Sequence, residues 1–174
     1  MLICVGGLPG SGRKDFAHRI AEKSGFYAFD LESNMRTLLL RREYQRGEET
    51  LSDALRLRMF QHVARNFAHV SETFRNVIVD EPFHRIVPRE FLFAEGARYF
   101  KRVAVVWVEE TEAHIEERIL RVREKNPRLT PVTARTIIET MERDFEPFVT
   151  PPIFAYNVVN NPLVVDNVVR ALAR

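Results

Sequence analysis

Residues 7–14 read GLPGSGRK and form the stretch that decides the fold. The stretch follows the apolar run 2–5 and precedes a segment in which Phe16, Ala17 and Ile20 recur at helical spacing. Glycines in such a strand-to-helix turn let backbone N–H groups surround phosphate oxygens, and the following helix adds its positive N-terminal end. The sequence therefore predicts a phosphate-binding loop here, in preference to a glycine-rich turn without a ligand.

Two positions of this loop depart from the Walker A pattern G-x-x-x-x-G-K-[ST]. Arg13 replaces the lysine that reaches the β- and γ-phosphates, and it keeps the charge on a planar fork. Lys14 replaces the Ser or Thr that ligates Mg²⁺, a role that an ammonium group cannot fill. Two arrangements would restore the chemistry: Lys14 serves as the phosphate lysine with Arg13 turned outward, or Asp15, Asp30 or Asp80 holds Mg²⁺ through water. The other interpretation is that catalysis is weak or absent.

Short apolar runs alternate with helical patterns along the whole chain. The expected strands are residues 2–5, 26–29, 77–79, 103–108 and 156–159. The expected helix boundaries are Gly25, Ser33, a capping box of Thr50 and Asp53, Pro88, Gly96, Thr111, Thr130-Pro131 and Asn161-Pro162. This alternation predicts one α/β domain over residues 1–174, with a mostly parallel sheet and right-handed crossovers.

Composition excludes several other classes of protein. The 174 residues are 45% apolar and 29% charged, an ordinary globular mixture, and the net charge of +2 is low for a nucleic-acid-binding protein. The single cysteine, Cys4, cannot form an internal disulfide, and no apolar run approaches the roughly 20 residues needed to cross a bilayer. We therefore expect a cytoplasmic protein without a membrane partner, and nucleic acid is disfavoured as a partner. Most of the 13 phenylalanines are assigned to the core, and a few to a substrate wall.

Acidic residues close two of the expected strands. Asp80 follows the run 77–79, where an acid of a phosphate-loop protein holds Mg²⁺ or its water shell, and Glu81 is a second candidate. Asp30 closes the second strand, where a carboxylate facing the γ-phosphate accepts the proton of the acceptor hydroxyl. Arg36, in the helix that follows, is placed to bind an anionic or hydroxylated acceptor.

A basic segment precedes Pro127. Its cations are Arg118, Arg121, Arg123, Lys125 and Arg128. Cations suit the last turn of a helix, which accounts for Arg123 and Lys125 but less well for Arg118 and Arg121. We expect a lid over about residues 118–131, in which Arg121 or Arg118 neutralises the transferring phosphate.

These stretches together resemble the small P-loop kinases of the nucleoside-monophosphate-kinase-like fold, especially gluconate-kinase-like and zeta-toxin-like ATP-binding kinases. The resemblance rests on GLPGSGRK (7–14), FDLESNMR (29–36), VIVDEP (77–82), ILRVREKNPR (119–128) and FAYNVVNNP (154–162). It implies a three-layer P-loop NTPase fold, with a five-stranded parallel sheet in the order 2-3-1-4-5, flanking helices and a small helical lid. It also implies Mg²⁺ and ATP as cofactors, and phosphoryl transfer to a small acceptor.

The candidate site combines the residues above. The nucleotide-binding candidates are Gly7, Pro9, Gly10, Ser11, Gly12, Arg13, Lys14, Asp15, Arg118 and Arg121. The catalytic candidates are Asp30, Arg13 and Arg121; Asp30 and Arg36 are the substrate-binding candidates, and Asp80 is the metal ligand through water. The first hypothesis is a kinase that phosphorylates a small hydroxylated or phosphorylated acceptor. The second is a catalytically impaired nucleotide-binding or sensor protein, and the third, which the modest charge disfavours, is an RNA-end kinase.

Overall fold

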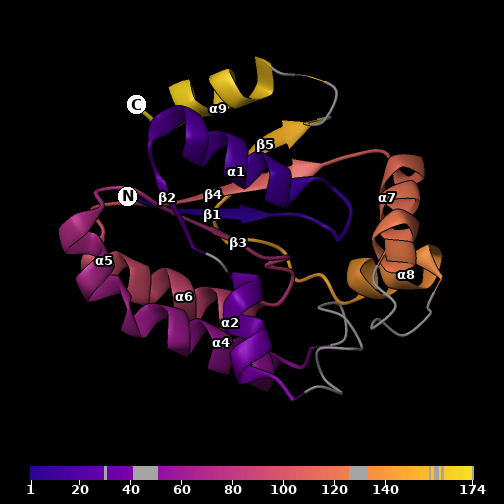
Figure 1. Cartoon of the computed structure of the whole chain (residues 1–174), viewed down its shortest axis with the longest axis horizontal. Coiled ribbons are helices and arrows are strands. Elements are labelled where there is room, and N and C mark those ends of the chain that lie inside the picture. The colour runs from indigo at the N-terminus through magenta and orange to yellow at the C-terminus, as the bar shows by residue number, and fades with distance from the viewer. Residues whose placement is uncertain are drawn as a thin grey trace.

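A five-stranded parallel sheet runs through the middle of the molecule (Figure 1). The computed structural model describes residues 1–29, 31–40, 51–125, 133–156, 158, 161 and 163–173. The strands are β1 (Leu2–Gly6), β2 (Tyr27–Phe29), β3 (Val77–Asp80), β4 (Val103–Glu109) and β5 (Ile153–Tyr156). They lie in the order β2-β3-β1-β4-β5, and every neighbouring pair is parallel. The predicted fold class and strand order are confirmed.

Strand β1 is the central strand, and all five of its residues are buried. Val5 of β1 pairs with Asp80 of β3, and Gly6 pairs with Trp107 of β4. Because parallel strands end at the same edge of the sheet, the residues that follow β1, β3 and β4 meet there. The loop 7–14 therefore lies at the edge where ligands of α/β sheets bind.

Helices cover both faces of the sheet (Figure 1). One face carries α1 (Arg13–Ser24) and α9 (Leu163–Leu172), and the other carries α4 (Asp53–Arg65), α5 (Phe67–Thr73) and α6 (Ile86–Tyr99), with α2 (Leu31–Leu38) against α4. Side chains of β1 alternate between the two cores: Leu2 and Cys4 pack toward α4–α6, whereas Ile3 and Val5 pack toward α1 and α9. Burial on both faces explains the continuous apolar run of this strand.

Helices α7 (Glu112–Lys125) and α8 (Ala134–Arg143) form a separate pair at the carboxyl edge of the sheet (Figure 1). These two helices are called the lid pair below, because α7 contains the start of the expected lid. Their contact is a small apolar cluster that includes Ile115, Ile119, Ile137 and Met141, and Leu8 of the loop packs against it. The cluster therefore joins α7 to α8 and joins both helices to the loop. Part of the expected lid, residues 126–131, lies outside the described residues.

Several predicted boundaries need correction. Helix α4 is capped by Ser52, whose Oγ accepts a hydrogen bond from the Leu55 N–H at 3.4 Å, whereas Thr50 lies outside the described residues. The apolar stripe of Leu55, Met59, Val63, Phe67 and Val70 predicts one helix, but α4 ends at Arg65 and α5 begins at Phe67. Helix α1 ends at Ser24 with Gly25 as its C-cap, as expected.

Two further predictions fail for packing reasons. The last strand was expected at residues 156–159 but spans Ile153–Tyr156, because this stretch pairs with residues 106–109 of β4. Gly96 does not end α6, which continues to Tyr99. A Cβ on Gly96 would overlap the Leu2 side chain, so this glycine lets α6 approach β1 closely.

Ser33 does not begin a helix, because α2 already starts at Leu31. The other helix starts lie close to their predicted positions. Pro88 lies in the first turn of α6, and the Asn161 side chain accepts a hydrogen bond from the Leu163 N–H at 3.1 Å as α9 begins. Helix α8 begins after Thr133, whose Oγ1 accepts from the Thr136 N–H at 3.2 Å, and residues 130–131 lie outside the described residues. In the part of the chain that the structure describes, no helix has the length and apolar character that a membrane crossing requires.

Candidate functional site

The loop 7–14 connects β1 to α1 in a conformation that depends on glycine. Gly7 and Gly10 have φ angles of 150° and 83°, which side-chain-bearing residues rarely adopt. A Cβ on Gly10 would lie 2.7 Å from the Ile115 carbonyl oxygen of α7. Because Gly10 lacks that atom, the lid pair can dock directly on the loop. Pro9 is buried in the same loop.

Arg13 is bound to the loop itself. Its guanidinium Nη1 donates to the Gly7 carbonyl at 3.3 Å and to the Leu8 carbonyl at 3.2 Å, and the residue is only 7% exposed. One interpretation of the sequence required Arg13 to be turned outward, and the structure shows that it is not. Arg13 neutralises the partial negative charge of two loop carbonyls, which would otherwise oppose a bound anion.

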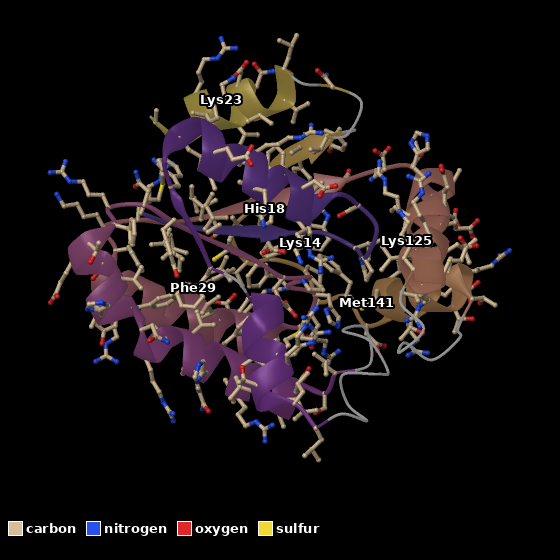
Figure 2. The ribbon with its side chains drawn as sticks, viewed as in Figure 1. Lys14, His18, Lys23, Phe29, Lys125 and Met141 are labelled. Atoms are coloured by element: carbon tan, nitrogen blue, oxygen red, sulfur yellow. The ribbon has the colours of Figure 1, made fainter. Side chains whose placement is uncertain are left out.

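The next two side chains are exposed in the first turn of α1. Lys14 and Asp15 both lie on the solvent side of this turn. Figure 2 shows Lys14, His18 and Lys23 in order along α1, with Lys14 at the end that joins the loop. The Lys14 side chain therefore starts close to the loop and to the N-terminus of α1, where a bound phosphate would lie.

Ser11 gives the loop a buried polar group. The residue is 1% exposed, and its Oγ has no hydrogen-bond partner among the described residues. A buried hydroxyl without a partner costs free energy, so its position favours a ligand that completes the hydrogen bond. Ser11 therefore fits the predicted nucleotide-binding loop.

Arg118 joins α7 to the loop. Its Nη1 donates to the Gly10 carbonyl at 2.9 Å, and its Nη2 lies 3.3 Å from Oε2 of Glu110. The Glu110 side chain is fully buried and also contacts His114, at 3.2 Å from Nδ1. Burial by itself would raise the pKa of Glu110, but the Thr111 N–H, His114 and Arg118 together hold that pKa below its ordinary value.

Arg121 lies elsewhere on the same helix. It pairs with Glu117, one turn earlier, at 2.5 Å, and both side chains are about 60% exposed. Of the two predicted lid arginines, the structure therefore brings Arg118 to the loop and leaves Arg121 on the solvent side. The role predicted for Arg121 stays a prediction.

The two acids after β3 have different surroundings. Asp80 is half-buried beside the end of β1, next to the loop. Glu81 forms an ion pair with buried Arg56 of α4, and its Oε2 accepts from the Phe83 N–H at 2.7 Å. Because Arg56 already balances its charge, Glu81 is the poorer candidate for a metal ligand.

The predicted acceptor residues are only partly visible. Asp30 lies outside the described residues, and Arg36 is exposed in the last turn of α2. Helix α2 contacts α4, on the side of the sheet opposite α1. The predicted roles of both residues stay predictions.

A magnesium ion would find few protein ligands here. Among the described residues, no three His, Cys, Asp or Glu side chains gather as a metal cluster. Mg²⁺ commonly keeps several waters and binds through one or two carboxylates plus substrate phosphates. Asp80 beside a phosphate loop fits that kind of site, with the phosphates supplying the other oxygens.

A cavity of about 530 Å³ opens beside the loop, between β4, β5 and the lid pair. It is lined by Leu8, Ser11, Trp107, Val108, Glu109, Glu110, Ile115, Glu142, Phe145, Phe148, Pro152 and Phe154. Its volume suits a small molecule. Sequence reasoning applied the strand-end rule to Asp30 and Asp80 but not to Glu109 and Glu110, although these acids close the apolar run 103–108 in the same way.

A family model described as an AAA domain matches residues 2–148. The chain therefore belongs to this AAA-domain family. No curated protein matches the chain.

Three solved kinases share the fold over nearly the whole chain. An unliganded sugar kinase from Janibacter sp. HTCC2649 is 15% identical with a TM-score of 0.68, covering 99% of this chain and 94% of that one. The APS kinase of Mycobacterium tuberculosis, in complex with AMPPNP and APS, is 14% identical with a TM-score of 0.69, covering 99% and 97%. A gluconokinase from Sinorhizobium meliloti 1021 is 17% identical with a TM-score of 0.63, covering 98% and 94%. These likenesses show the fold, which is that of the P-loop kinases, so the predicted resemblance is confirmed.

A buried histidine makes the stability of the fold sensitive to acid. His84 is 4% exposed, and burial, followed by the charges of Arg56 and Arg85, lowers its pKa to about 3 against the opposing effect of Asp144 and Asp53. Between that value and the ordinary pKa of 6.5, the unfolded chain binds a proton that the folded chain does not. His84 therefore lowers the free energy of unfolding as the pH falls through this window.

We expect His84→Gln to remove this component. The free energy of unfolding of the native chain should fall by about 1 kcal/mol more per pH unit below pH 6 than that of the variant. Urea unfolding between pH 7 and pH 4 measures the difference, with exposed His18→Gln as the control. Equal slopes for the native chain and His84→Gln would contradict a neutral, buried His84.

Proposed function

We propose that the chain is an ATP-dependent kinase that transfers the γ-phosphoryl group to a small hydroxylated or phosphorylated acceptor. The observation that carries the proposal is the loop 7–14, which has glycine-dependent geometry, the unpartnered hydroxyl of Ser11 and α7 docked against it. The fold is shared with kinases, one of which was solved with AMPPNP and APS, and this supports ATP as the donor.

In the proposed reaction, the acceptor oxygen forms a bond to the γ-phosphorus. The bond between that phosphorus and the β–γ bridging oxygen breaks, and ADP leaves with its electron pair. Asp30 takes the proton of the acceptor hydroxyl, and Arg36 binds the acceptor. Asp80 would hold Mg²⁺ through water, and the ion would supply positive charge beside the phosphates.

The loop and lid cations have separate tasks in this proposal. Arg13 keeps the loop carbonyls neutralised, and exposed Lys14 takes the position of the phosphate lysine. Arg118 stabilises charge on the transferring group from α7, where it already contacts Gly10. This division is supported by the burial of Arg13 and by the side-chain directions of the two lid arginines.

A second candidate is a nucleotide-binding protein with impaired catalysis, which senses ATP or docks to a partner. It is favoured by one observation: Arg13 is engaged by the loop carbonyls, and position 14 carries no hydroxyl for Mg²⁺. In that case ATP binding depends little on Mg²⁺, whereas a kinase binds the Mg²⁺ complex preferentially.

The kinase proposal predicts turnover of ATP with at least one acceptor class. The measurement is ADP release with ATP, Mg²⁺ and a panel of polyols, sugars, nucleosides and nucleotides. Asp30→Asn should lower turnover by about 10²- to 10⁴-fold, because the acceptor proton loses its base. Asp166→Asn, which alters an ion pair between Asp166 of α9 and Lys23 of α1 on the surface, should leave turnover unchanged. Absence of turnover with every acceptor would contradict the proposal, and full turnover in Asp30→Asn would remove Asp30 as the base.

The lid arginines offer a matched comparison on one helix. We expect Arg118→Gln to lower kcat/KM for ATP by about 10- to 100-fold, the usual effect of losing a charged hydrogen bond. Arg121→Gln should change kcat/KM by about twofold or less, because its partner Glu117 is exposed. A larger loss in Arg121→Gln would assign the phosphate-stabilising charge to Arg121.

A further inference from the structure

The cavity beside the loop has an aromatic wall built from three elements. Trp107 of β4 lies with its ring centroid 5.2 Å from that of Phe145 and 5.5 Å from that of Phe148, at interplanar angles of 59° and 68°. Phe154 of β5 is 46% exposed and lines the same cavity. Large apolar rings left open at a cavity favour a ligand with an apolar or aromatic body.

Buried Arg89 holds this wall in place. Arg89 of α6 is fully buried, donates to the carbonyls of Glu146 and Pro147, and has its guanidinium carbon 4.3 Å from the Phe148 ring centroid. Arg85 adds a hydrogen bond to the Asp144 carbonyl at 3.1 Å. The segment that carries Phe145 and Phe148 is therefore tied to α6, so the wall is formed before a ligand arrives.

The charge of the cavity is negative. The residues that line it include Glu109, Glu110 and Glu142, and no Lys, Arg or His is among the described residues that line it. Arg118 balances the charge of Glu110. Glu109 and Glu142 leave an acidic rim, which attracts a positively charged group and repels a phosphate or a carboxylate.

A buried polar group joins the cavity to the loop. Ser11 lines the cavity, and its unpartnered Oγ belongs to the phosphate-binding loop. Leu8 of the loop also lines it. A molecule in the cavity therefore lies against the loop that the proposed function assigns to the triphosphate, with a hydroxyl of its own able to pair with Ser11.

We propose that this cavity, and not Arg36, holds the body of the phosphoryl acceptor, and that the acceptor has an apolar or aromatic body, a hydroxyl group and a positively charged amine. Arg36 is not among the residues that line the cavity. That the bound molecule is an acceptor rests on the proposed kinase function, whereas binding of such a molecule does not depend on catalysis. The aromatic rings contact its body, and both the rings and the acidic rim attract its ammonium group.

Trp107 makes the cavity directly observable, because it is the single tryptophan of the chain. Its fluorescence is titrated, without nucleotide, with three phenols of similar size: tyramine, which is cationic, 4-ethylphenol, which is neutral, and 3-(4-hydroxyphenyl)propionate, which is anionic. Adenosine is the fourth ligand. Excitation beyond the absorption of phenols and adenosine keeps the signal specific, and saturation-transfer NMR on the same mixtures detects binding independently.

The expected result is that tyramine binds about tenfold more tightly than 4-ethylphenol and that the anion binds most weakly. Glu142→Gln should reduce the preference for the cation severalfold. Glu139→Gln removes the same charge from α8 at an exposed position paired with Arg135, and it should leave the preference intact.

Three results would overturn the inference: equal or tighter binding of the neutral or anionic phenol, tightest binding of adenosine, or no binding of any phenol in either measurement. Turnover separates this inference from the proposed function. If tyramine binds with the expected charge preference while no acceptor is phosphorylated, the cavity assignment stands and the kinase proposal fails. If other acceptors are phosphorylated while tyramine does not bind, the kinase proposal stands and the acceptor class fails.

Discussion

The hydrogen bonds from Arg13 to the carbonyls of Gly7 and Leu8 are the interaction on which the rest of the site depends. A loop that receives phosphates has to keep the negative ends of its peptide groups occupied. Arg13 does this at the start of the loop, and Arg118 does it at Gly10. The loop is therefore braced from within and from α7 before any nucleotide binds.

These hydrogen bonds from Arg13 and Arg118 change how the altered Walker A motif is interpreted. An arginine in place of the lysine is engaged by the loop itself, and in the proposed function the exposed cation of the next residue binds the phosphates. The same brace fixes the lid pair, because Gly10 allows the Ile115 carbonyl to approach and Leu8 packs into the apolar cluster between α7 and α8. The start of the predicted lid therefore contacts the phosphate loop directly. The cavity between this lid pair and β4 follows from that docking.

The sequence was sufficient for the fold because local patterns and topology agree. The alternation of strands and helices indicates the α/β class. The strand order follows from the resemblance of the whole chain to known kinases. The errors are local: Ile153–Tyr156 competes with residues 156–159 for the edge of the sheet, and only pairing with β4 decides between them. Gly96 carries the usual signal of a helix end, but its reason is contact with Leu2, which is distant in sequence.

The site was predicted less completely than the fold. The loop, Asp80 and Arg118 come from motifs that have a fixed order along the chain. Side-chain direction does not follow from such motifs. The sequence analysis therefore named Arg121 as the catalytic lid arginine, whereas the structure brings Arg118 to the loop and pairs Arg121 with Glu117. Glu110 was within reach of the strand-end rule. The aromatic wall was not, because Trp107 and Phe145 are brought together by tertiary packing held by Arg89 and Arg85.

The central claim is that this braced loop binds the triphosphate of ATP with Mg²⁺ in spite of its altered residues. Calorimetric titration of the native chain with ATP, in Mg²⁺ and then in EDTA, tests the claim most directly. The account predicts measurable binding that Mg²⁺ strengthens by about tenfold or more. Binding of equal strength in Mg²⁺ and EDTA would support a nucleotide-binding protein that is not a kinase, and absence of ATP binding would contradict the assignment of the loop itself.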